Sequence, residues 1–154
     1  MHSLLGNAQL LVLAPALLVA AIHDLRTRTI RNRLVLSIAI AGLTTQVVTG
    51  GWQGLATGVS AAALGFLCLL PLYLTKGMAG GDVKLMAATG TWLTVPLVLA
   101  ATGTALVVGA LIAGFHLLMR RPDTAIAYAP AIALGTFGAL WWQLSLIHIS
   151  EPTR

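Results

Sequence analysis

Two aspartates are the residues of this sequence best suited to chemistry. Asp82 follows Gly80 and Gly81 at the head of a long apolar stretch, and Asp24 precedes an arginine-rich segment. The two glycines let the backbone adopt turn geometries closed to other residues and leave the acid uncovered. Two close carboxylates cannot both ionise cheaply, so they share a proton, and one activates water while its protonated partner polarises a carbonyl group. The pair is therefore suited to acid–base hydrolysis.

Each aspartate also has a purely structural interpretation. Asp82, placed after a turn, has a residue type favoured at the N-cap of a helix. Asp24 is expected at the C-terminal end of a helix, where the helix dipole disfavours a carboxylate. The remaining structural explanation for Asp24 is a surface ion pair with Arg26 or Arg28, which stabilises little. Asn32 suits the N-cap of the next helix.

The composition indicates a membrane protein. The chain has 154 residues, of which 58% are hydrophobic and only 8% charged, whereas soluble domains have about 25% charged residues. A membrane-spanning helix needs about 20 apolar residues, so the chain has room for about six. The sequence predicts an all-α, polytopic membrane protein with about six transmembrane helices.

The charge and cysteine content point away from several classes of function. The net charge of +5 comes from basic residues in short loops between apolar runs, where the positive-inside rule accounts for them. Nucleic acid is therefore not an expected partner, whereas membrane lipid is. The lone Cys68 provides neither a disulfide nor a paired-cysteine metal site, and no metal or other cofactor is expected.

The apolar runs define the helices that must position the aspartates. The uncharged turn 50–53 separates the second run from the third, and a fold-back near Pro96 is needed because residues 85–119 would exceed one span. Trp92 is expected at the outer membrane interface, and Pro130 is expected to kink the last helix. The helices are expected at 4–22, 34–49, 54–75, 82–93, 95–119 and 124–144.

Loop charges predict the orientation in the membrane. The loops that contain residues 26–33, 76–84 and 120–121 are basic, and the intervening loops carry no charge. The basic loops should be cytoplasmic, which places both chain termini outside the inner membrane. Asp24 ends one helix and Asp82 begins another, so both can lie at the inner face. Lys84 could lower the pKa of the pair, hold a lipid phosphate or extend to the interface.

Two other polar residues have ordinary structural interpretations. His116 is a candidate proton carrier, but a polar contact with a neighbouring helix explains it better. Asp123 follows Pro122 and suits a helix cap.

The residues around the aspartates resemble a known family. Asp24-Leu-Arg-Thr-Arg-Thr-Ile-Arg-Asn32, followed by Met78-Ala-Gly-Gly-Asp82-Val-Lys-Leu-Met86 and by 128–135, is similar to the type IV prepilin peptidases, which are intramembrane aspartic proteases with a Gly-x-Gly-Asp signature. The resemblance implies that Asp24 and Asp82 are a catalytic dyad. It also implies cleavage of prepilin leaders at the cytoplasmic face, typically after a glycine. The substrates would be small membrane proteins with a basic leader and one apolar helix.

The sequence departs from the family pattern at two positions. Ala79 stands where the signature has its first glycine, and Arg31 stands where a proline often precedes the asparagine. The chain resembles the short form that serves Flp/Tad-type pili, without the domain of the bifunctional members, so no methyltransferase activity is expected. Residues 1–143 are interpreted as one peptidase domain, and 144–154 as an atypical tail that resembles a translated sequencing adapter.

Two other functions fit the sequence less well. A proton-coupled carrier or channel subunit could use the two aspartates as a relay, but it would favour acids at mid-membrane depth and a repeat between halves. A non-catalytic assembly subunit would need Asp82 only as a helix cap.

Overall fold

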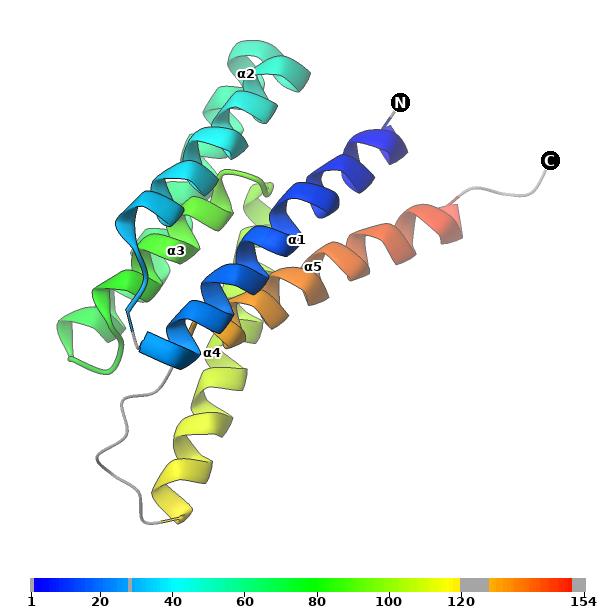
Figure 1. The fold of residues 1–154 in the computed structure, drawn as a ribbon. Coiled ribbons are helices and arrows are strands. Elements are labelled where there is room, and N and C mark those ends of the chain that lie inside the picture. The colour runs from blue at the N-terminus through cyan, green and yellow to red at the C-terminus, as the bar shows by residue number, and fades with distance from the viewer. Residues whose placement is uncertain (1, 28, 120–127, 151–154) are drawn as a thin grey trace.

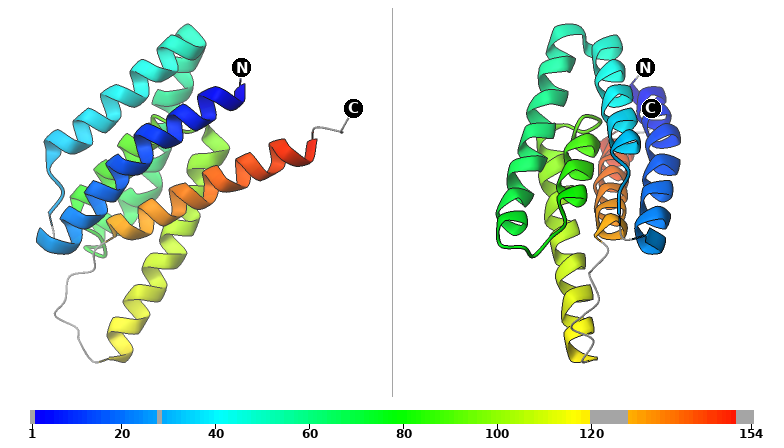
Figure 2. Two further views of the ribbon diagram at one scale, coloured as in Figure 1. Left: turned by 45° about the vertical axis from the view of Figure 1, so that its right-hand side comes forward. Right: turned by 60° about the vertical axis from the view of Figure 1, so that its left-hand side comes forward.

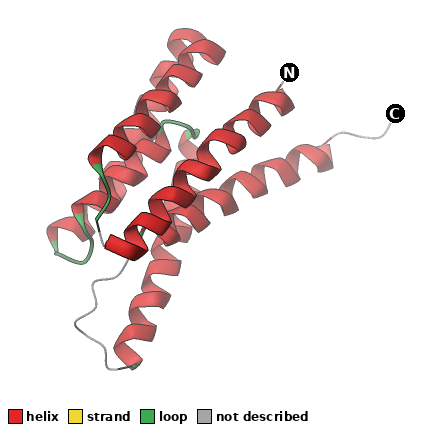
Figure 3. Ribbon diagram, in the orientation of Figure 1, coloured by secondary structure: helices red, strands yellow, loops and turns green. Residues whose placement is uncertain are grey.

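The computed structural model describes residues 2–27, 29–119 and 128–150, and these ranges are helical, with short loops and no strand (Figure 3). The prediction of an all-α fold is confirmed. The helices are α1 (His2–Thr27), α2 (Asn32–Leu74), α3 (Gly80–Gly90), α4 (Val95–Leu118) and α5 (Ala129–Ser150).

Helix α2 is a hairpin of two arms, residues 32–50 and 52–74. Gly51 has φ 55° and ψ −137°, far from helical values, and the chain reverses there. A Cβ atom on Gly54 would collide with the backbone oxygen of Gln46, so the two arms touch just after the turn. Figure 2 shows them side by side. The two helices expected at 34–49 and 54–75 are these arms, and the uncharged turn lies where it was predicted.

Among the described residues, α2 and the segment Val95–Phe115 of α4 are long and apolar enough to cross a membrane. Helix α2 reaches this length with its two arms taken together. Many large apolar side chains are exposed on the surface, among them Trp52, Leu111 and Trp142. Both observations support a membrane-associated protein. Helix α3 has 11 residues and a length of about 16 Å, about half of a bilayer core. The figure of about six transmembrane helices stays a prediction.

Helix α3 packs against both arms of α2. Gly90 lies so close to the backbone of Ala61 that a Cβ atom on it would come within 2.8 Å of the Ala61 oxygen. The indole N–H of Trp92 donates a hydrogen bond of 2.9 Å to the Ile38 carbonyl oxygen, and Trp92 is only 5% exposed. The expectation of Trp92 at the outer interface is therefore wrong. Its ring packs inside the bundle because its N–H finds a buried acceptor there.

Helix α5 packs against α4 and α1. It begins at Ala129, so Pro130 lies in the first helical turn, where its missing N–H leaves no hydrogen bond unmade. The expected kink at Pro130 is therefore wrong. The helix continues past residue 144 to Ser150, and a separate tail at 144–154 stays a prediction. The side chain of His116 and all of Asp123 lie outside the described residues.

The conformation of Gly51 yields a stability prediction. Its positive φ with strongly negative ψ is open to glycine alone, so we expect Gly51→Ala to lower the free energy of unfolding by about 1–3 kcal/mol. Gly50 is the matched control, because it also has open space for a Cβ atom but lacks a positive φ. Gly50→Ala should leave stability unchanged or raise it by up to about 1 kcal/mol. Equal effects in thermal unfolding of the purified variants would contradict the strained turn.

Candidate active site

Three helix termini meet at one end of the molecule. The C-terminal end of α1 and the N-terminal ends of α3 and α5 lie near one another (Figure 1). A cavity of about 230 Å³ lies here, and its wall is formed by α1, the loop after α1, the start of α2, and α3 with the residue before it. Both aspartates are in this wall. Five of the residues predicted for the site are in its wall, and Gly80 instead packs against the ring of Tyr73. The lining residues are Asp24, Thr29, Ile30, Asn32, Ala79, Gly81, Asp82 and Lys84.

Asp24 lies in the last turn of α1 and is 5% exposed. The backbone N–H of Ala129 donates a hydrogen bond of 3.3 Å to its Oδ2 atom. That N–H belongs to the first turn of α5, whose dipole attracts a negative charge. The favourable dipole of α5 therefore offsets the unfavourable dipole of α1 at this carboxylate. This partner could not be found from the sequence, because the two residues are 105 positions apart.

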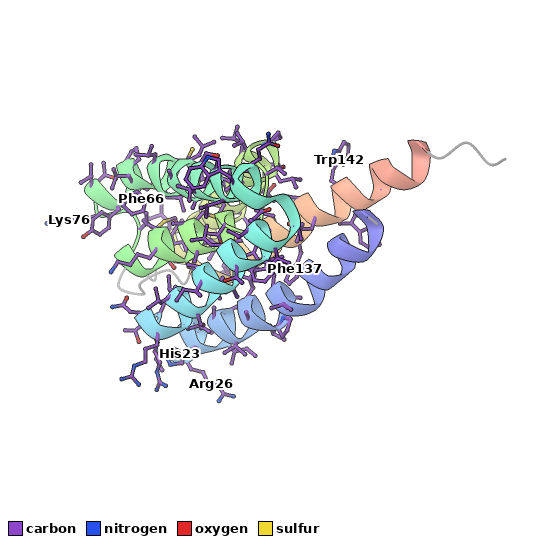
Figure 4. The ribbon with its side chains drawn as sticks, turned by 90° about the horizontal axis from the view of Figure 1, so that it is seen from above. His23, Arg26, Phe66, Lys76, Phe137 and Trp142 are labelled. Atoms are coloured by element: carbon purple, nitrogen blue, oxygen red, sulfur yellow. The ribbon has the colours of Figure 1, made fainter. Side chains whose placement is uncertain are left out.

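The ion pair considered for Asp24 is not formed with Arg26. Arg26 is exposed and extends from the outer edge of the molecule (Figure 4). Arg28 lies outside the described residues. The polar partner of buried Asp24 in the described residues is therefore the backbone N–H of Ala129 rather than Arg26.

Asp82 is the third residue of α3 and is 2% exposed. The N-cap is Ala79, so Asp82 is not the cap that its sequence position suggested. Its carboxylate accepts a hydrogen bond from the Ala79 backbone instead, an arrangement found where the third residue of a helix reaches back to the cap. Asn32 is likewise not an N-cap, because α2 begins at Asn32 and its N-cap is Arg31.

Burial raises the pKa of Asp82 to about 7, the nearby Asp24 carboxylate contributes to the rise, and the Ala79 hydrogen bond partly opposes both effects. Asp82 lies outside the two candidate membrane spans. Its carboxyl group therefore keeps a proton up to neutral pH. The pKa of the Tyr128 phenol is raised by burial and by the charge of Asp82, so this residue, which precedes α5, belongs to the surroundings of the pair.

The glycines before Asp82 do not form an open turn. Positive φ values in the described residues occur at Gly51 and Lys76, whereas Gly80 and Gly81 begin α3. A Cβ atom on Gly81 would lie 3.3 Å from the Ile30 Cβ atom. The expectation that the acid is uncovered is therefore wrong, because the absent side chain makes room for Ile30.

The loop that carries Ile30 is held in place by His23. The Nδ1 atom of His23 lies 2.8 Å from the Thr29 carbonyl oxygen and 2.9 Å from the Thr27 hydroxyl group. These contacts hold the start of the loop back beside α1, next to the cavity. Sequence reasoning missed His23, although its place next to Asp24 was a usable signal.

The geometry can support acid–base chemistry on a bound carbonyl group. The two carboxyl groups line one small cavity, each has a backbone N–H donor, and one of them retains a proton near neutral pH. A site of this kind can hold a water molecule beside one acid and a carbonyl oxygen beside the other.

Comparison with known proteins agrees with this site. The chain is 34% identical over 144 residues to the prepilin leader peptidase/N-methyltransferase of Pectobacterium carotovorum subsp. carotovorum, covering 84% of this chain and 50% of that protein. It is 30% identical over 137 residues to the Bacillus subtilis (strain 168) protein of the same name, covering 85% and 54%. No solved structure matches the chain significantly.

The match to the family extends over most of the helices that build the cavity. The chain spans about half the length of the curated relatives it matches. Residues 11–114, which include both aspartates, match the type IV leader peptidase family. With these relatives and this match, the chain belongs to the type IV leader peptidase family.

Proposed function

We propose that this chain is an aspartic endopeptidase that removes the basic leader peptide of Flp-like type IV prepilins. The observation that carries the proposal is the burial of Asp24 and Asp82 in the wall of one cavity. The relatives named prepilin leader peptidase support the substrate class. Asp24 and Asp82 are the catalytic residues in this proposal, and Gly81, Asn32 and Lys84 support them from the same cavity wall.

The two carboxyl groups take different roles. Asp82 enters the reaction protonated, and its proton hydrogen-bonds the oxygen of the scissile carbonyl group. Asp24, whose oxygen faces the N-terminus of α5, enters ionised and accepts a proton from the attacking water. The water oxygen bonds to the carbonyl carbon as Asp82 protonates the carbonyl oxygen. Collapse of this intermediate breaks the peptide bond: Asp24 gives its proton to the leaving amine, and one hydroxyl group of the intermediate returns a proton to Asp82, which restores the starting state of the pair.

The proposed location is the inner membrane, with the site at the cytoplasmic face. The end of α1 and the start of α2, which carry Arg26 and Arg33, lie beside the cavity, and the positive-inside rule favours the cytoplasm for such basic segments. With both arms of α2 crossing, the chain passes the membrane several times. Both acids lie near helix ends rather than in the middle of long apolar helices, which favours hydrolysis over a proton relay.

Conservative substitution of either acid tests the dyad. We expect Asp24→Asn and Asp82→Asn each to lower the rate of cleavage of a prepilin peptide by about 10²–10⁴-fold, because each removes one half of the acid–base pair. Asparagine keeps a carbonyl oxygen for the Ala129 or Ala79 N–H, so the fold should survive. Asp123→Asn, which changes the aspartate that the sequence predicts to be a helix cap, is the control. Normal cleavage by a folded Asp82→Asn variant would refute the assignment.

The raised pKa of Asp82 predicts the pH dependence. A reaction that needs protonated Asp82 proceeds below its pKa of about 7 and is lost as the pH rises through that value. We therefore expect kcat/KM to fall about tenfold per pH unit above neutrality. The measurement is cleavage of the same peptide over a pH series, with the fold monitored by circular dichroism. A rate that stays level up to about pH 9 would contradict the role of Asp82 as the acid.

A further inference from the structure

A second, larger cavity adjoins the one that holds the two aspartates. It has a volume of about 440 Å³ and lies between the two arms of α2, with α3 beside it. Most of its wall is apolar, and three of its residues have polar side chains: Asn32, Lys84 and Thr91. The other lining residues are Val35, Leu36, Ala39, Ala62, Phe66, Ala87 and Ala88. We refer to this cavity as the apolar groove.

The apolar groove begins where the aspartate cavity ends. Asn32 and Lys84 line both cavities. From Asn32, the first arm of α2 contributes residues at spacings of three, four and seven. The same spacings run from Lys84 in α3 to Thr91, the residue that follows this helix. These spacings describe one face of each helix over two turns. The groove therefore extends about 10 Å from the aspartates along both helices.

The two cavities differ in the polarity and charge of their walls. The aspartate cavity contains both buried carboxyl groups, whereas the groove contains no acid among its lining residues. The polarity of a prepilin-like substrate changes at its scissile bond, with a basic leader before the bond and an apolar helix after it. A peptide bond held between the carboxyl groups would have its leader at the acidic cavity and its apolar segment beside the groove.

We propose that the apolar groove binds the first two turns of the apolar helix that follows the scissile bond of the substrate. This inference rests on the proposed function and names the surface that positions the substrate. The occupant is a helix, because the groove presents two turns of two helices with alanines at four positions, which allow close approach. Binding energy gained along this helix would hold the scissile bond at the carboxyl groups.

Filling the groove tests the proposal kinetically. Ala62 lines the groove and is half-buried, while its neighbour Ala63 is exposed and does not line it. We expect Ala62→Leu to raise KM about tenfold for a peptide with a basic leader, a glycine and an apolar helix, because uniform binding is lost. Ala63→Leu should leave KM unchanged. Equal KM values for the two folded variants would overturn the proposal.

Cross-linking provides a test that does not require the larger leucine side chain to be tolerated in the groove. With Cys68 replaced by alanine and Asp82 by asparagine to prevent cleavage, Ala62→Cys or Ala63→Cys is treated with a short bismaleimide and the same peptide. The peptide carries one cysteine within about seven residues after the glycine, which is two helical turns. The Ala62→Cys protein should cross-link to it, and the Ala63→Cys protein should not.

The outcomes separate the groove from the peptidase activity. If the unmodified protein fails to cut the peptide, the proposed function fails. If it cuts the peptide while Ala62→Cys and Ala63→Cys cross-link equally, the groove proposal fails and the function stands. Equal rates of maleimide alkylation of the Ala62→Cys thiol with and without peptide would also overturn the proposal.

Discussion

The cost of burying two carboxyl groups side by side in an apolar protein is the constraint on which the rest of this structure depends. Neither Asp24 nor Asp82 has more than 5% of its surface exposed, and ionising both would place two negative charges in a poorly solvated space. Two features lower this free-energy cost. Each carboxyl group accepts a backbone N–H, from Ala129 and Ala79 respectively, and one proton remains on Asp82 near neutral pH.

The helices are placed so that these backbone donors reach the acids. Helix α3 is fixed against both arms of α2, by close backbone contact at Gly90 and by the hydrogen bond from Trp92 to Ile38. Helix α5 is fixed against α4, where a Cβ atom on Gly135 would collide with the backbone oxygen of Ala101. Asp82 and Asp24 thus belong to two differently packed groups of helices, and the cavity lies where these groups meet. Small residues outside the cavity thus let the helices pack closely, and this packing positions the two acids.

Much of this arrangement could be predicted from local signals. Apolar run lengths indicated the all-α fold and the reversal at residues 50–53, and the ends of those runs placed Asp24 and Asp82 at helix termini. The partners of the acids could not be predicted, because Ala129 contributes only a backbone N–H and carries no mark of that role. The predicted location of Trp92 was wrong for a related reason. An indole suits an interface and a buried acceptor equally well, and only the fold decides between them.

The central claim is that Asp24 and Asp82 form one buried pair that retains a proton at neutral pH. The most direct test is an infrared titration of the protein with isotopically labelled aspartate, in which protonated and ionised carboxyl groups absorb separately. The account predicts one protonated carboxyl signal that persists to about pH 7 and is absent from Asp82→Asn. If every aspartate in the folded protein ionises near the ordinary value of about 4, the two acids do not share a buried site and the account is wrong.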